Sequence, residues 1–187
     1  MKRQYLGDSK DSFKWDYLHF LMDDIGYRDL KIAWMMTPDD KSLDGKTPPE
    51  SFNARAEIIS FCNRIKSDRN PILLSDLPST TNATYSVSFH KPDHYFDKVS
   101  RNSYFSDIIL QTDQLLFLDP DNGFEPERNF TEKHLRYLEI EKILGAAAPN
   151  SVAIVFQHHR RKIFRKTSPA FVSALKLNTP RQFTGTH

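Results

Sequence analysis

A run of four apolar residues that ends in a polar turn limits the fold of this chain more than any other feature. Residues 115–118 read Leu-Leu-Phe-Leu, and residues 119–123 read Asp-Pro-Asp-Asn-Gly. Continuous apolar runs that end in turn residues are typical of strands buried in parallel sheets. Open α/β sheets bind ligands just beyond the carboxyl ends of such strands. We therefore predict a functional site that contains Asp119, Asp121 and Asn122. The alternative is a β-turn in which Asp121 and Asn122 only hydrogen-bond their own backbone.

The order of helical and extended patterns predicts one α/β domain over residues 1–187. Helices are expected over residues 8–25, 50–67, 92–111 and 131–144, and strands over residues 31–36, 71–75, 85–89, 115–118 and 151–157. The crossovers between strands are long enough for parallel pairing, which predicts a layered sandwich around a mostly parallel sheet. The alternation of residues 85–89 suits an edge strand.

Apolar residues at helical spacing predict which face of the first helix is buried. Phe13, Tyr17, Phe20, Leu21 and Ile25 recur at this spacing and Leu18 widens the stripe, so we expect this face to be buried. Trp15 and Trp34 are expected to be core residues as well.

The single cysteine and the lack of long apolar runs exclude several classes of protein. Cys62 cannot form an internal disulfide or a multi-cysteine zinc site, and its apolar neighbours predict a buried structural thiol. No apolar run approaches the roughly 20 residues of a membrane helix, and the first residues lack the apolar centre of a signal peptide. We expect a cytoplasmic protein with no membrane partner.

Positive charge is concentrated at the end of the chain, in a basic segment over residues 158–187. Residues 151–187 contain seven Lys or Arg and no Asp or Glu, a formal charge of about +7, whereas residues 1–150 carry about −5. A polyanion such as nucleic acid is the expected partner, unless this segment forms salt bridges with the acidic body. The residues expected to contact nucleic acid are Arg160, Arg161, Lys162, Arg165 and Lys166.

Two short motifs resemble those of ribosomal-RNA adenine-N6 methyltransferases. Residues 7–14, Gly-Asp-Ser-Lys-Asp-Ser-Phe-Lys, resemble the Asn/Gly-x-x-Asp-x-x-Lys start of that family, and residues 119–122 resemble its Asp-Pro-Pro-Tyr motif. A group of bacterial proteins with an Asp-Pro-Asp-Asn-Gly motif and a later Tyr/Phe-Gln-His is similar to this chain in both regions. The resemblance implies a three-layer Rossmann-like, methyltransferase-like fold and methylation of a base in nucleic acid.

The resemblance also implies roles for individual residues. Asp119 would accept the exocyclic amine of an extruded base, and Asp8 and Lys14 would lie near S-adenosylmethionine. The chain departs from the family pattern at the stacking tyrosine, where Asn122 stands, so that Phe124 is the nearest aromatic ring. The family's glycine turn after the first strand is also replaced, by Thr-Pro-Asp-Asp at residues 37–40.

A second reading of the same residues is a metal-dependent nuclease. Asp119 and Asp121 would then be oxygen ligands of Mg²⁺. Gln157 and His158 follow the next strand, so His158 could act as general base or as a ligand beside them. The basic residues that follow would favour a phosphodiester substrate.

A third reading is a catalytically degenerate module that binds nucleic acid or protein. The basic segment would contact phosphates, and Phe164, Phe171 and Phe183 would supply apolar contacts. Across the enzymatic readings, the predicted catalytic residues are Asp119, Asp121, Asn122, Gln157 and His158. The sequence leaves open the oligomeric state, the target base and the choice between DNA and RNA.

Overall fold

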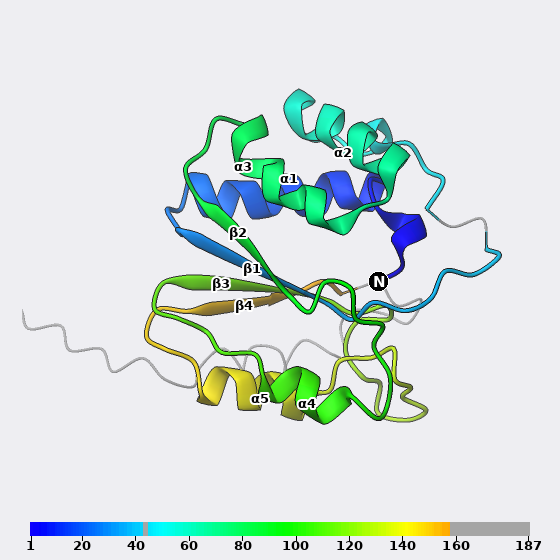
Figure 1. The fold of residues 1–187 in the computed structure, drawn as a ribbon, viewed down its shortest axis with the longest axis vertical. Helices are drawn as coiled ribbons and strands as arrows, with labels where there is room; N and C mark the ends of the chain where they lie inside the picture. The colour runs from blue at the N-terminus through cyan, green and yellow to red at the C-terminus, as the bar shows by residue number, and fades with distance from the viewer. Residues whose placement is uncertain (43–44, 158–187) are drawn as a thin grey trace, which may run out of the picture. The chain divides into compact units, whose positions relative to one another are not determined.

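Four parallel strands form the sheet at the centre of the fold (Figure 1). The computed structural model describes residues 1–42 and 45–157. The strands are β1 (Asp29–Trp34), β2 (Ser86–His90), β3 (Gln114–Asp119) and β4 (Val152–Val155). Their order in the sheet is β2-β1-β3-β4, and every neighbouring pair is parallel. The expected parallel α/β sheet is confirmed, and β2 is its expected edge strand.

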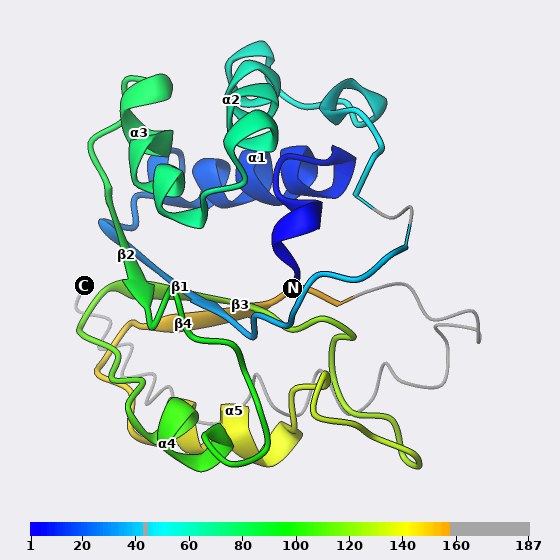
Figure 2. The ribbon, with the colours of Figure 1, turned by 45° about the vertical axis from the view of Figure 1, so that its right-hand side comes forward.

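Helices cover both faces of the sheet, which gives three layers. One face carries α1 (Ser9–Asp23), α2 (Ala56–Asp68) and the short α3 (Leu77–Thr80), and the other carries α4 (Arg101–Ser106) and α5 (Tyr137–Gly145) (Figures 1 and 2). Short 3₁₀ turns lie at Arg3–Tyr5, Pro49–Ser51 and Pro71–Asp76. The fold is therefore a three-layer, Rossmann-like sandwich, as the sequence predicted.

The two central strands divide their side chains between two cores. Leu115 and Phe117 of β3 belong to the core under α1 and α2, whereas Leu116 and Leu118 belong to the core under α4 and α5. Every residue of β3 is buried, because helices cover the sheet on both sides. Side chains alternate along a strand, so Asp119 follows Leu115 and Phe117 toward α1.

The strand order reverses between β1 and β3. The chain passes from β1 to β2 on one side of β1, and then returns past β1 to form β3 on its other side. In open α/β sheets, ligands bind at such a switch point, beyond the carboxyl ends of the strands. Here that position lies after Trp34 of β1 and Asp119 of β3, which are partners in the register.

The buried face of α1 differs from the prediction. Phe13, Tyr17, Phe20 and Ile25 are exposed by 40% or more of their surface. The buried residues of α1 are Asp11, Ser12, Lys14, Trp15, Leu18, His19 and Met22. The apolar stripe did not predict the buried face, because Asp11 and Lys14 are buried as well. Their burial is possible because Lys14 pairs with Asp11 and Asp119. The expected burial of Trp15, Trp34 and Cys62 is confirmed.

Three predicted elements also have different limits or types. Residues 71–75 form a 3₁₀ turn rather than a strand, since Pro71 starts it and the Asn70 side chain accepts a hydrogen bond from Ile72 N. The helix expected over residues 92–111 is limited to α4. The helix expected from residue 131 begins at Tyr137, where Glu139 accepts a hydrogen bond from Arg136 N. Among the described residues, no helix is both long and apolar enough to cross a membrane.

Candidate functional site

A buried lysine connects the first helix to the end of β3. The Lys14 Nζ atom lies 2.7 Å from Asp119 Oδ2 and 2.6 Å from Asp11 Oδ1. The three side chains are at most 4% exposed. We call Asp11, Lys14 and Asp119 the Lys14 cluster. It joins the two motifs that carry the family resemblance, across 105 positions of sequence.

The start of α1 is built to hold this cluster in place. The Asp8 side chain caps the helix and accepts hydrogen bonds from Lys10 N and Asp11 N. Gly7 N donates to Asp11 Oδ2 at 2.8 Å. Gly7 has a φ of +73°, and a Cβ there would lie 2.3 Å from the carbonyl oxygen of Cys62, so only glycine fits. Asp8, expected near a cofactor, thus serves as the helix cap.

The Lys14 cluster contains two carboxylates and one ammonium. Burial raises the pKa of Asp11 to about 6, although the nearby Lys14 opposes this change. Burial acts to lower the pKa of Lys14, but Asp11 and Asp119 outweigh it and the pKa is raised. Lys14 therefore stays charged, and the cluster keeps one negative charge in excess when both acids are ionised. Such a site attracts a cation or a group that donates hydrogen bonds.

Asp121 belongs to a different group of charges, only two residues away. Its Oδ2 atom accepts a hydrogen bond from Thr37 Oγ1 at 3.2 Å and lies 3.6 Å from Lys133 Nζ. Its Oδ1 atom lies 3.5 Å from the Met1 ammonium. We call these four residues the Asp121 cluster. Burial acts to raise the pKa of Asp121, but the Met1 ammonium, Lys2 and Lys133 outweigh it and the pKa is lowered.

The first residue of the chain lies against the end of β1. Met1 donates from its ammonium to the carbonyl oxygen of Met35 at 3.1 Å, and Met1 O accepts from Thr37 N at 2.8 Å. Figure 2 shows the N-terminus beside this end of the sheet. Backbone groups at the end of β1 are thus already hydrogen-bonded within the chain.

The polar turn after β3 is fixed by Gln157, which follows β4. Gln157 Oε1 accepts a hydrogen bond from Phe124 N at 2.8 Å. Gly123 has a φ of +75°, and a Cβ there would lie 2.5 Å from Gln157 Oε1. Asn122 is exposed, and its backbone N donates to Lys133 O at 3.1 Å.

The ring of Phe124 is not open to a stacking base. It is 7% exposed and lies parallel to the ring of Tyr137, with 4.7 Å between the ring centroids. The only aromatic ring that the sequence offered near the turn is therefore packed inside the protein.

The structure brings several predicted site residues to one edge of the sheet. Lys14, Asp119, Asp121 and Gln157 lie at the carboxyl ends of β3 and β4 or contact residues there, and Asn122 lies on the turn. Asp8 is the cap of α1. Six further predicted residues lie outside the described part of the chain: His158, Arg160, Arg161, Lys162, Arg165 and Lys166.

Sequence reasoning missed four residues of the two clusters: Met1, Asp11, Thr37 and Lys133. Asp11 could have been found, because it lies three positions before Lys14 on one helix face. The contacts of Met1, Thr37 and Lys133 with Asp121 depend on the tertiary fold and leave no signal in the sequence.

The magnesium ligands of the nuclease reading are only partly among the described residues, because His158 lies outside them. No three His, Cys, Asp or Glu side chains among them are grouped so that they could hold a metal ion. Asp119 and Asp121 face ammonium groups, whereas Mg²⁺ requires carboxylate oxygens that are open to bind it.

The charge of the site fits one end of S-adenosylmethionine. The excess negative charge of Asp11 and Asp119 over Lys14 is complementary to the sulfonium cation of this cofactor. A buried donor also lies on the same sheet face, since the indole nitrogen of Trp34 has no hydrogen-bond partner among the described residues. The end of β1, which Met1 covers, offers no glycine turn for the nucleoside end.

Comparisons with known proteins do not assign a function to this site. No family model, no curated protein and no solved structure matches the chain.

Proposed function

We propose that this chain is a nucleic-acid-modifying enzyme of methyltransferase-like fold, which acts on an amino group of a base. The observation that carries the proposal is the contact between Lys14 Nζ and Asp119 Oδ2 at the switch point of the sheet. The resemblance assigns these two residues to one active site, and their contact supports that assignment.

Asp119 has the properties of an acceptor for an exocyclic amine. Lys14 stays protonated and donates a hydrogen bond to one carboxylate oxygen of Asp119, which fixes the position of that oxygen. Asp11 adds a second negative charge on the far side of Lys14. A carboxylate held in this way can accept hydrogen bonds from an amine and orient it for reaction. When bound, S-adenosylmethionine supplies the methyl group.

The exposed turn after β3 is the proposed contact for the base. An enzyme that modifies a base must first take it out of the stack and bind its polar edge. Asn122 presents an amide on this turn, close in sequence to Asp119, whereas the Phe124 ring is occupied by Tyr137. We therefore assign recognition of the base edge to Asn122 rather than stacking to Phe124.

Calorimetry with S-adenosylmethionine and a methyl-transfer assay test this proposal. The full chain is titrated with the cofactor, and transfer of a labelled methyl group to DNA and RNA is then measured. Asp119→Asn should fold, because Lys14 then faces one carboxylate, Asp11, and the charges balance. We expect cofactor binding by both proteins, weaker in the variant because the excess negative charge is lost, and a loss of transfer in the variant of roughly 100-fold or more at saturating cofactor.

The matched control is Lys10→Met, an exposed position on the same helix, which should leave transfer unchanged. Two results would overturn the proposal. One is the absence of cofactor binding together with Mg²⁺-dependent nicking of nucleic acid. The other is full methyl transfer by Asp119→Asn.

A further inference from the structure

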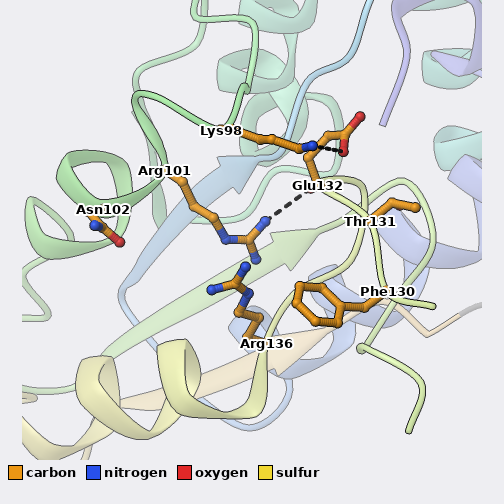
Figure 3. A pocket seen from close by; sticks show the side chains of 7 residues that line it. All are labelled: Lys98, Arg101, Asn102, Phe130, Thr131, Glu132 and Arg136. Carbon is orange, nitrogen blue, oxygen red and sulfur yellow. Dashed lines mark hydrogen bonds and ion pairs between the residues drawn. The ribbon is translucent and has the colours of Figure 1, made fainter. Parts of the chain in front are cut away.

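A pocket of about 500 Å³ lies between the start of α4 and the segment before α5 (Figure 3). We infer that this pocket binds a phosphate group of the nucleic acid strand, an inference that rests on the proposed function. Arg136 lines this pocket and has no acidic partner among the described residues.

Arg101 forms a wall of the pocket and has its own partners. It pairs with both carboxylate oxygens of Glu139, one of them 2.6 Å from Nη2. It also donates to the carbonyl oxygens of Glu132 at 3.1 Å and His134 at 2.8 Å. Because its charge is matched by Glu139 and its side chain is 6% exposed, Arg101 holds the pocket in shape.

Arg136 differs from Arg101 in having no acidic partner. Within residues 1–42 and 45–157, no carboxylate lies within ion-pair distance of its guanidinium, which lies over the Phe130 ring at 4.7 Å. Its Nε atom is buried and donates no hydrogen bond to any described residue. Figure 3 shows the guanidinium groups of Arg136 and Arg101 facing each other. The two guanidinium groups carry two positive charges, and among the described residues only one carboxylate, that of Glu139, pairs with either of them. The space beside them therefore suits an anion.

The remaining lining residues match a phosphate better than a single carboxylate. Lys98 is 81% exposed and lies 3.9 Å from Glu132, so this pair is weak and Lys98 can turn to a ligand. With Lys98 and Arg136 against Glu132, the pocket has one positive charge in excess. Asn102 and Thr131 add an amide and a hydroxyl at the rim. These donors and the Arg136 guanidinium together suit the several oxygens of a phosphate.

The pocket and the Asp119 turn share one segment of chain. Phe130, Glu132 and Arg136 line the pocket, and between them Lys133 contacts Asp121 and accepts the hydrogen bond from Asn122 N. A nucleic acid strand with a phosphate in the pocket would therefore run along residues 130–136, the segment that contacts the turn after β3. Phe130, which is 48% exposed, offers a ring face to a neighbouring base.

Binding of a fluorescent single-stranded oligonucleotide to the full chain tests this inference. Arg136→Gln should weaken binding about tenfold and reduce the salt dependence by about one phosphate contact. Lys98→Ala should weaken it less. The matched controls are Arg128→Gln and Lys142→Ala, exposed residues outside the pocket, which should bind as the unaltered chain does. Thermal unfolding checks that Arg136→Gln is folded.

Inorganic phosphate and S-adenosylmethionine serve as further probes. Phosphate should compete with the oligonucleotide on the unaltered chain and not on Arg136→Gln, while cofactor binding should be equal in both. Equal oligonucleotide affinity for Arg136→Gln and Arg128→Gln would overturn the inference, as would a pocket that binds phosphate but no oligonucleotide. If methyl transfer fails while the Arg136 effect stands, only the proposed function is wrong.

Discussion

Asp119 and Asp121 are separated by one proline, yet they occupy opposite electrostatic environments. Asp119 is in contact with one ammonium, that of Lys14, which it shares with a second buried acid, Asp11. Asp121 is the only acid in its cluster and lies beside Lys133 and the Met1 ammonium, which also interacts with Asp119. The first cluster has two acids for one lysine, whereas in the second Lys133 and the Met1 amine, whose pKa is lowered by burial, lie beside a single acid. Spacing in the sequence therefore does not show whether two acids act together.

The difference between the clusters follows from the geometry of the strand end. Asp119 is the last residue of β3, and strand alternation directs it toward α1 and Lys14. Pro120 ends the strand, and the turn then carries Asp121 to Thr37 and Met1 at the end of β1. In the proposed function, the Lys14 cluster accepts a donor from a ligand, whereas the Asp121 cluster contacts the turn from the end of β1. Four predictions test this division.

The largest effect is expected when the Lys14 cluster loses its cation. Lys14→Met leaves Asp11 and Asp119 buried without a positive partner, which should lower the free energy of unfolding by about 3–5 kcal/mol at pH 7. Urea unfolding measures the change. Lys10→Met, on the exposed side of α1, is the control and should change it by less than about 0.5 kcal/mol. A loss below about 1 kcal/mol for Lys14→Met would contradict the cluster.

The pH dependence of Asp11→Asn tests the excess negative charge. The pKa of Asp11 is raised to about 6, so its favourable contribution is complete below its ordinary value of 3.8 and is lost as the pH rises through about 6. Asparagine retains an acceptor for Gly7 N and lacks this titration. Relative to the unaltered chain, the variant should gain on the order of 2 kcal/mol in stability between pH 4 and pH 7. A difference in stability between the variant and the unaltered chain that is constant with pH would contradict the raised pKa of Asp11.

Asp121→Asn should show the opposite trend with pH. The pKa of Asp121 is lowered, so its contribution to stability is present above its ordinary value of 3.8 and is lost as the pH falls further. The variant should lose about 1–2 kcal/mol at pH 7 and less near pH 3. Unfolding curves at both pH values measure this. If both aspartate variants followed the same trend, the contrast between the clusters would be wrong.

The smallest effect is expected for Lys133→Ala. The Lys133 side chain is 40% exposed and lies 3.6 Å from Asp121, so the pair is screened by solvent. Its loss should cost less than about 1 kcal/mol, and the cost should fall further in high salt. Thermal unfolding at low and high salt is sufficient to measure it. A larger cost that is independent of salt would place Lys133 among the buried groups of the turn.

The parallel sheet could be predicted from the sequence because its central strands are unambiguous. Residues 115–118 are apolar throughout and end at a turn, which fits a strand covered on both faces. Residues 71–75 are also apolar but form a 3₁₀ turn, since a short apolar run alone does not separate a strand from a buried turn.

The site was predictable only in part. Asp119, Asp121 and Gln157 follow strands whose ends meet in a parallel sheet, so their location could be argued from strand order. The buried face of α1 could not be predicted, because most of its apolar stripe is exposed. Phe13, for example, packs on Phe52, with 5.0 Å between the ring centroids. Burial of Asp11 and Lys14 depends on a partner 105 positions away, which periodicity does not reveal.

Methyl transfer by the Asp119→Asn and Asp121→Asn variants, measured side by side, tests the central claim most directly. Both changes remove one carboxylate charge from the same turn. The account predicts that Asp119→Asn reduces transfer of the labelled methyl group roughly 100-fold or more, and that Asp121→Asn reduces it by less than about tenfold. Equal losses in the two variants, or no transfer by the unaltered chain, would contradict it.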